Sequence, residues 1–331
     1  MNIKLFVGID VSKDRLDAHI HSVGYGFMVA NAPSGYVELL ETCSARLGCK
    51  TSELFFCFEN TGRYSRPLAV CLAGVGIPFA MLPALEIKRS MGLKRGKSDR
   101  IDAKAIAAYA WRNRDEIRPT CLNSAMVSQL RQMLALRDKL IRHRTAYKNS
   151  IVDLKDNFFE GETAPIKQCQ ERMIDALNRE IDSLEAQIEA VIAQSELWQT
   201  NYRLIQTVKG IGPVLAKYLI IYTENFTRIN DPKRFACYAG IAPFEYSSGS
   251  SIKGRTRVHP CANKQLKSLL NIAAMGTIQF KGEYSEYYQR RTLQGKNKMS
   301  TLNIIRNKIV ARVYAVVKRQ SPYVDLMKFA A

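Results

Sequence analysis

The chain has 331 residues, of which 47% are hydrophobic and 24% are charged, a balance typical of a globular protein and not of a disordered one. Its length allows two or three domains, and its formal net charge of +19 indicates a polyanionic partner, usually nucleic acid and less often an anionic membrane surface. No apolar run approaches the roughly 18 residues of a transmembrane helix, and the charged N-terminus is not typical of a signal peptide.

The cysteines indicate the cellular compartment of the protein, and the distribution of basic residues indicates which part binds its partner. None of the eight cysteines forms a CxxC pair, and the four histidines lack zinc-site spacing, so we predict reduced, mostly buried thiols in a cytoplasmic protein. Residues 250–320 contain fifteen Lys or Arg but only two acids. We therefore expect the C-terminal part to carry most of the electrostatic attraction to nucleic acid.

Residues 1–118 are predicted to form a mixed α/β domain. The expected strands are 3–10, 15–21, 26–31, 53–60 and 77–82, and the expected helices are 34–47, 65–75, 85–92 and 99–113.

Residues 119–199 are predicted to be helical, with one helix over 124–156 and a second ending near 194. Apolar residues of the second helix recur at intervals of three and four, which is a heptad pattern; they are Ile174, Leu177, Ile181, Leu184, Ile188 and Val191. This seam predicts either an antiparallel hairpin with the preceding helix or a contact with a second chain.

Residues 200–331 begin with the stretch TVKGIGPVLAKYLI at 207–220, which resembles a helix-hairpin-helix turn around Gly210 and Gly212. Such a turn presents backbone N–H groups to a DNA phosphate, whereas the alternative is a simple tight turn. We expect a helix at 232–240, then a Ser-, Gly- and Arg-rich loop over 242–260. Basic helices are expected at 262–279, 283–293 and 299–319.

Four carboxylates stand where metal-assisted phosphodiester chemistry would need them. Asp10 and Glu59 each end an apolar strand, so both emerge at one sheet edge if those strands are neighbours. Asp99 and Asp102 lie on one face of a predicted helix in the stretch KRGKSDRIDAKAIA at 94–107. The surrounding cations, which include Lys94, Arg95 and Lys97, either neutralise the pair or leave it to bind a divalent cation.

Four segments together resemble one family along nearly the whole chain. They are GIDVSK (8–13), ENTGRY (59–64), KSDRIDA (97–103) and YAGIAPFEYSSGSSIKGRTR (238–257). They resemble the signature segments of the DEDD-type insertion-sequence transposases and the related Piv-like DNA invertases.

The resemblance implies an RNase H-like (RuvC-like) α/β N-terminal domain, a helical coiled-coil middle and a mainly α C-terminal domain with a catalytic serine. It places the acidic tetrad, which would hold Mg²⁺ or Mn²⁺, on Asp10, Glu59, Asp99 and Asp102. It places the nucleophile on Ser248, and the neighbouring serines Ser247, Ser250 and Ser251 are the alternative registers. Lys253, Arg255 and Arg257 follow closely and are candidates for gripping the scissile phosphate. Lys94, Arg95 and Lys97, which surround the paired aspartates, are expected to bind DNA.

The sequence therefore predicts a DNA recombinase, either a transposase or a site-specific invertase, located in the cytoplasm with the nucleoid. Its expected partners are double-stranded DNA and further copies of itself in a dimer or tetramer, without a membrane. Some members of the family use a structured guide RNA, which is a further candidate partner. The alternatives are a RuvC-like endonuclease that only hydrolyses DNA and a basic DNA-binding protein whose acids form salt bridges.

Overall fold

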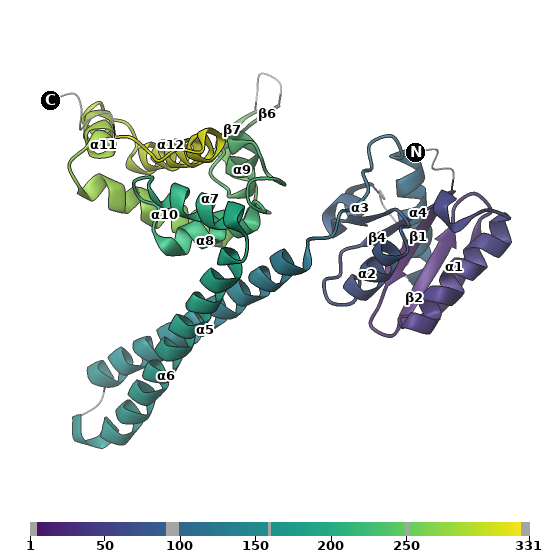
Figure 1. Ribbon diagram of the computed structural model, residues 1–331, viewed down its shortest axis with the longest axis horizontal. Coiled ribbons are helices and arrows are strands. Elements are labelled where there is room, and N and C mark those ends of the chain that lie inside the picture. Colours follow the sequence, from purple (N-terminus) through teal and green to yellow (C-terminus); the bar gives the residue numbers. More distant parts are fainter. Residues whose placement is uncertain (1–4, 91–98, 158–159, 249–251, 326–331) are drawn as a thin grey trace. The chain divides into compact units, whose positions relative to one another are not determined.

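The computed structural model describes residues 5–90, 99–157, 160–248 and 252–325, and it divides into two compact units, Met1–Asn123 and Ser124–Ala331 (Figure 1). The second unit contains the region predicted at 200–331 and, from Ser124 on, the region predicted at 119–199. Within the described ranges, no helix is both long and apolar enough to cross a membrane.

The first unit is built on a five-stranded mixed sheet with the order β3-β2-β1-β4-β5, which is consistent with an RNase H-like fold. The strands are β1 (Leu5–Val11), β2 (Arg15–Ile20), β3 (Tyr25–Ala30), β4 (Leu54–Glu59) and β5 (Phe79–Leu82). The central strand β1 pairs antiparallel with β2 and parallel with β4.

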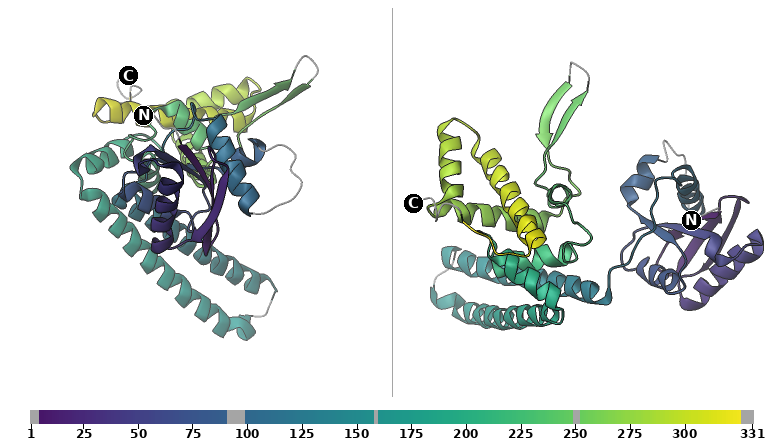
Figure 2. Two further views of the ribbon diagram at one scale, coloured as in Figure 1. Left: turned by 90° about the vertical axis from the view of Figure 1, so that its right-hand side faces the viewer. Right: turned by 45° about the horizontal axis from the view of Figure 1, so that its top comes forward.

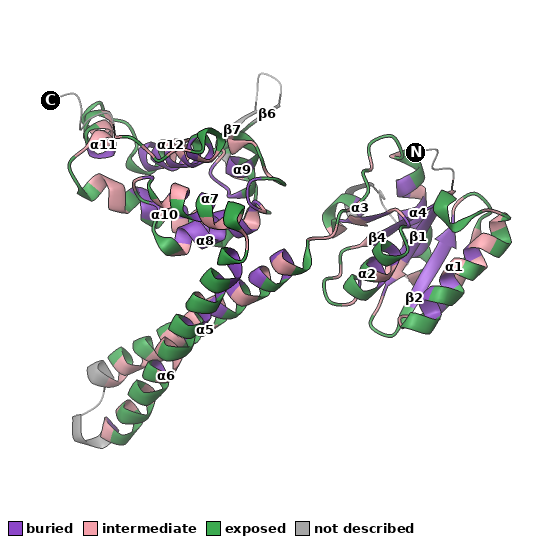
Figure 3. Cartoon of the chain, viewed as in Figure 1, coloured by how far each residue is buried: buried purple, intermediate pink, exposed green. Residues whose placement is uncertain are grey.

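Helices cover both faces of this sheet, so its central strands are apolar on both sides. Figure 3 shows the resulting buried strands. One face packs against α1 (Pro33–Leu47) and α2 (Arg66–Gly74), and the other packs against α3 (Ala84–Ser90) and α4 (Asp99–Arg112). The alternation along β1 assigns Val7 and Ile9 to the first face and Phe6 to the second.

Helix α4 lies directly against β1 because residue 8 is glycine. A Cβ atom at Gly8 would stand 2.2 Å from the backbone nitrogen of Ala107 and 2.5 Å from the carbonyl oxygen of Ala103. Any larger side chain would therefore push the helix off the strand. The small residues Ala103 and Ala107 are themselves buried and complete this close contact.

The second unit begins with an antiparallel helical hairpin of α5 (Ala125–Asn157) and α6 (Glu160–Ala193) (Figure 1). Three hydrogen bonds set its register. Arg137 Nε donates to Glu185 Oε1 at 2.6 Å, Arg144 donates to Asn178 at 2.9 Å, and Gln170 donates to Ser150 at 2.8 Å. Residue numbers rise on one helix as they fall on the other, as antiparallel pairing requires.

The apolar heptad residues of α6 are buried within the chain, in the hairpin with α5. Ile174, Ile181, Leu184, Ile188 and Val191 are buried, and Leu177 is half-buried. Helices α5 and α6 are in extensive contact, so the intramolecular alternative is the one that the chain adopts. The seam thus gives no support to dimerisation.

The rest of the second unit packs around one core that also includes the start of α5 and the end of α6. Its helices are α7 (Glu196–Gln206), α8 (Pro213–Tyr222), α9 (Pro232–Tyr238), α10 (Lys264–Gln279), α11 (Glu283–Leu293) and α12 (Lys298–Arg319). Lys217 of α8 is buried, and its ammonium lies 3.2 Å from Glu185 and 2.9 Å from Glu189 of α6. These contacts fix α8 against the hairpin.

Two predictions are wrong. The predicted loop over 242–260 contains a β-hairpin, β6 (Phe244–Ser248) and β7 (Ile252–Arg257), because serine- and glycine-rich strands lack the apolar alternation that marks a strand. The cysteines are all free, but they are not mostly buried. Cys43 and Cys57 are buried, whereas Cys121, Cys169, Cys237 and Cys261 are exposed.

Substituting Gly8 with alanine should destabilise the first unit by about 2 kcal/mol, since overpacking against backbone atoms cannot be relieved by a rotamer change. Chemical denaturation measures this loss of stability. Gly74→Ala is the control, because a Cβ atom at this exposed helical position meets no atom within 4 Å. We expect that change to be neutral or slightly stabilising. Equal stability of the two variants would contradict the packing argument.

Candidate functional site

Asp10 and Glu59 lie side by side at the ends of neighbouring strands. The parallel register of β1 and β4 pairs Ile9 with Phe58, and each acid is the next residue on its strand. Both carboxylates are half-buried, on the face of the sheet that α4 covers. The condition stated for the two acids to meet, that their strands are neighbours in one sheet, is therefore fulfilled.

The first turn of α4 brings two more acids to the same place. Asp99 and Asp102 are half-buried there, and α4 packs across β1 and β2. The pKa of Asp10 is raised from 3.8 to about 6, mainly by burial and then by the charges of Asp99, Asp102 and Glu59 in that order. The structure therefore brings all four predicted acids into electrostatic contact.

Two residues of β2 belong to the same cluster and were not predicted from the sequence. Asp17 pairs in register with Asp10, is only 4% exposed, and its Oδ2 has no hydrogen-bond partner. The Arg15 guanidinium lies 3.4 Å from Asp17 and forms a short ion pair with Asp99. The alternation of RLDAHI could have placed both residues on the face of the acids, because β2 neighbours β1.

The cluster suits a divalent cation in its donors and its charge. All candidate ligands are carboxylate oxygens, which Mg²⁺ and Mn²⁺ prefer. Burial and then the neighbouring carboxylates raise the pKa of Asp10, and a cation would relieve the repulsion among these carboxylates. In the described part of the chain no three metal-binding side chains are yet gathered tightly enough to hold an ion.

The predicted serine lies in the second unit, on the β6–β7 hairpin. Ser248 is the last residue of β6 and pairs with Ile252, while Ser247 pairs with Lys253. The hairpin extends away from the helical body (Figure 2). Ser250 and Ser251 lie outside the described residues. Among the described serines, Ser248 is the one nearest the hairpin's end.

The predicted nucleic-acid-binding cations fall into two groups. Lys253, Arg255 and Arg257 all lie on β7, the strand that pairs antiparallel with β6 and its Ser248. A register shift separates the pair Phe244–Arg257 from the pair Tyr246–Gly254, as a bulge does. Lys94, Arg95 and Lys97 lie outside the described residues.

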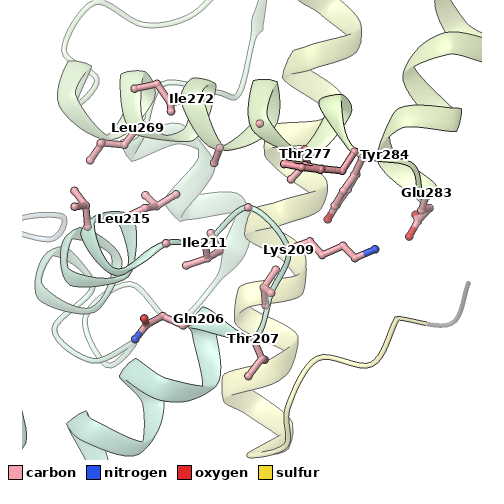
Figure 4. Close-up of a pocket in the computed structure, with 18 of the residues that line it drawn as sticks. Gln206, Thr207, Lys209, Ile211, Leu215, Leu269, Ile272, Thr277, Glu283 and Tyr284 are labelled. Carbon is pink, nitrogen blue, oxygen red and sulfur yellow. The ribbon is translucent and has the colours of Figure 1, made fainter. Parts of the chain in front are cut away.

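The turn at Gly210 and Gly212 joins α7 to α8 and borders an apolar cavity of about 610 Å³ (Figure 4). Gly210 has φ +89°, and a Cβ atom there would meet Thr277 of α10 at 2.6 Å. The glycine is thus required by packing against α10. Beside it, Lys209 is ion-paired with Asp325. Phosphate binding by this turn stays a prediction.

An RNase H-like sheet with clustered carboxylates, joined to a basic helical unit, defines an enzyme of the transposase class that acts on DNA. The chain belongs to the IS116/IS110/IS902 family of transposases, since that family's profile matches residues 202–289 and the profile of the IS110 DEDD transposase domain matches residues 7–160.

Curated relatives extend the likeness over the whole chain. The pilin gene-inverting proteins of Moraxella lacunata and Moraxella bovis are each 26% identical, over 97% of this chain and 98% of theirs. An uncharacterised 43.6 kDa protein of insertion element IS110 from Streptomyces coelicolor is 25% identical over 38% of this chain and 30% of its own length.

Asp10→Asn should stabilise the metal-free protein at neutral pH. The folded-state pKa of Asp10 is about 6 against an ordinary 3.8, so the folded state binds the proton more tightly than the unfolded state. This contribution to stability is therefore lost as pH rises from about 4 to about 6. The melting temperatures of variant and wild type, measured with a chelator, should agree near pH 4 and diverge above pH 6.

The exposed Asp14→Asn change, which removes one carboxylate outside the acid cluster, is the matched control. Adding Mg²⁺ or Mn²⁺ should raise the wild-type melting temperature more than that of Asp10→Asn. A lower melting temperature for Asp10→Asn than for wild type at pH 7.5 without metal would contradict the proposed charge repulsion.

Proposed function

We propose that this chain is a DNA recombinase, a transposase or a site-specific invertase, that cuts and rejoins strands through a covalent phosphoserine at Ser248. The observation that carries the proposal is the convergence of Asp10, Glu59, Asp99 and Asp102 from two strands and one helix. Convergent carboxylates are needed for metal-assisted phosphoryl transfer but have no use in a protein that only binds DNA.

Asp10, Glu59, Asp99 and Asp102 would hold the divalent cation. When bound, such a cation neutralises charge on the reacting phosphate and lowers the pKa of a coordinated hydroxyl. Asp17 would add negative charge beneath the cluster, and Arg15 would restrain Asp99. The oxygen donors favour Mg²⁺ or Mn²⁺.

Ser248 would supply the nucleophile. Its Oγ attacks the phosphorus atom, loses its proton to a base, and displaces a deoxyribose oxygen that takes up a proton. Rejoining reverses the exchange, because a strand hydroxyl attacks the phosphoserine and releases the serine. The position of Ser248 on a projecting hairpin, whose second strand β7 carries Lys253, Arg255 and Arg257, supports this role.

The acids and the serine belong to different compact units. We propose that they meet on DNA in a dimer or tetramer, with the acids of one protomer facing the serine of another. This part of the proposal rests on the division of the chemistry between units, since α5 already covers the heptad seam. The Moraxella relatives are named for inverting a pilin gene, which favours double-stranded DNA as the substrate. A guide RNA remains a further candidate partner.

Ser248→Ala should bind DNA with wild-type affinity, form no covalent adduct and give no recombination. The measurement is to trap the protein–DNA adduct, digest it and locate the modified residue by mass spectrometry. Ser247→Ala, one position along β6, is the matched control and should keep its adduct. Modification of Ser247, Ser250 or Ser251 would move the nucleophile. An enzyme that cleaves without any serine adduct would be the hydrolytic nuclease.

Mixing Asp10→Ala protein with Ser248→Ala protein should restore part of the recombination that each has lost, because some sites then combine an intact acid cluster with an intact serine. The recombined product is measured over a range of mixing ratios. Co-purification of differently tagged variants verifies that they assemble together. Mixed assemblies that stay inactive at every ratio would place the site within one protomer.

A further inference from the structure

A second cavity of the second unit lies at the base of the β6–β7 hairpin and has a volume of about 700 Å³. The start of α10 contributes Lys264, Lys267 and Ser268, and α12 contributes Ser300, Asn303 and Arg306. Pro243 and Thr256 line it from the two ends of the hairpin. The described lining includes three cations and no acid, so the cavity is suited to an anion.

Arg306 is the unusual member of this lining. It is 5% exposed, and its contacts are with neutral acceptors, the side-chain oxygens of Asn271 and Asn303. Its Nε is buried and has no hydrogen-bond partner. Burial lowers the pKa of Arg306, and no acidic neighbour among the described residues offsets that effect. The guanidinium nevertheless stays charged.

The other strongly buried cations of the described chain make the contrast clear. Arg137 donates to Glu185 at 2.6 Å, and Lys217 lies within 3.2 Å of Glu185 and Glu189. Each of those charges is compensated by carboxylates. Arg306 is buried to the same degree but is held by amides alone, which orient the guanidinium without neutralising it.

Two helix N-termini add to the positive potential of the cavity. Lys264, Lys267 and Ser268 belong to the first turns of the 16-residue helix α10, and Met299 and Ser300 belong to the first turn of the 22-residue helix α12. The positive end of each helix dipole favours an anion nearby. These dipoles support a site that already contains a buried, uncompensated guanidinium.

The cavity is also connected to Ser248 by the short strand β6, since Pro243, which precedes that strand, lines it. Strand β6 has five residues, and its four steps from Phe244 to Ser248 span about 14 Å at roughly 3.4 Å per residue. A DNA strand advances about 3.4 Å per nucleotide along the duplex axis. A DNA strand that reaches the end of the hairpin would therefore pass the cavity a few nucleotides from the nucleotide beside Ser248.

We propose that this cavity binds a phosphodiester group of the DNA strand that reaches the serine hairpin, with Arg306 as its central ligand and Lys264 and Lys267 beside it. The DNA substrate rests on the proposed function, whereas the anion site itself rests on the cavity and on Arg306. Binding at this point fixes the strand relative to Ser248 without taking part in bond cleavage.

The test compares full-length wild type with Arg306→Gln, Lys267→Gln and the control Lys318→Gln, an exposed cation of α12 outside the cavity. Replacing chloride by inorganic phosphate at equal ionic strength should raise the melting temperature of wild type and of Lys318→Gln. The rise should be lost in Arg306→Gln. In chloride, Arg306→Gln should melt at the wild-type temperature or above it, because the variant removes an uncompensated buried charge.

DNA binding provides the second measurement. For a short duplex of arbitrary sequence, Arg306→Gln should bind about tenfold more weakly and reduce the slope of log K against log salt by about 0.9, as expected for one lost phosphate contact. Lys267→Gln, at a half-buried surface position, should lower the slope similarly and tests the cavity without touching the core. Loss of slope with an RNA hairpin alone would overturn the assignment to DNA.

A purely structural Arg306 would give the opposite pattern, with a lower melting temperature in chloride and unchanged salt slopes in both cavity variants. That result overturns the inference but leaves the proposed function intact if wild type still forms the Ser248 adduct. Conversely, absence of any serine adduct, together with a phosphate-dependent melting shift that needs Arg306, would refute the covalent mechanism and retain the anion site.

Discussion

The close contact of α4 with β1 at Gly8 is the constraint on which the first unit depends. With no Cβ at that position, helix backbone and strand backbone can approach to distances that any other residue would block. The first turn of α4 consequently lies over the strand ends, where Asp99 and Asp102 join Asp10 and Glu59. The packing of small residues, rather than any polar attraction, brings these like charges together.

The clustered carboxylates repel one another, and this unfavourable arrangement indicates a functional site. A surface that only had to be soluble would spread its acids, whereas here a half-buried Asp10 is surrounded by four further carboxylates and has a pKa of about 6. Strongly perturbed groups of this kind concentrate at functional sites. The pairing of Arg15 with Asp99 and Asp17 offsets part of the repulsion.

The described part of the second unit contains buried cations of two kinds, those paired with carboxylates and one held only by amides. At the junction of α6 and α8, Arg137 and Lys217 are matched by Glu185 and Glu189, so these charges hold helices together. The same contacts lower the pKa of Glu185 although its burial acts in the opposite direction. Beneath the β6–β7 hairpin, Arg306 is buried without such a partner, which distinguishes a structural ion pair from a site that awaits an anion.

The sequence by itself determined the order of strands and helices in the first unit, the candidate acids and serine, and the family, because apolar periodicity and short motifs are local properties of the chain. Only the tertiary structure decided which alternatives hold. The heptad seam is closed by α5, the serine-rich segment is a hairpin, and Asp17, Arg15 and Arg306 acquire their roles from neighbours distant in sequence. Burial and charge compensation depend on what packs against a residue, and no local pattern records that.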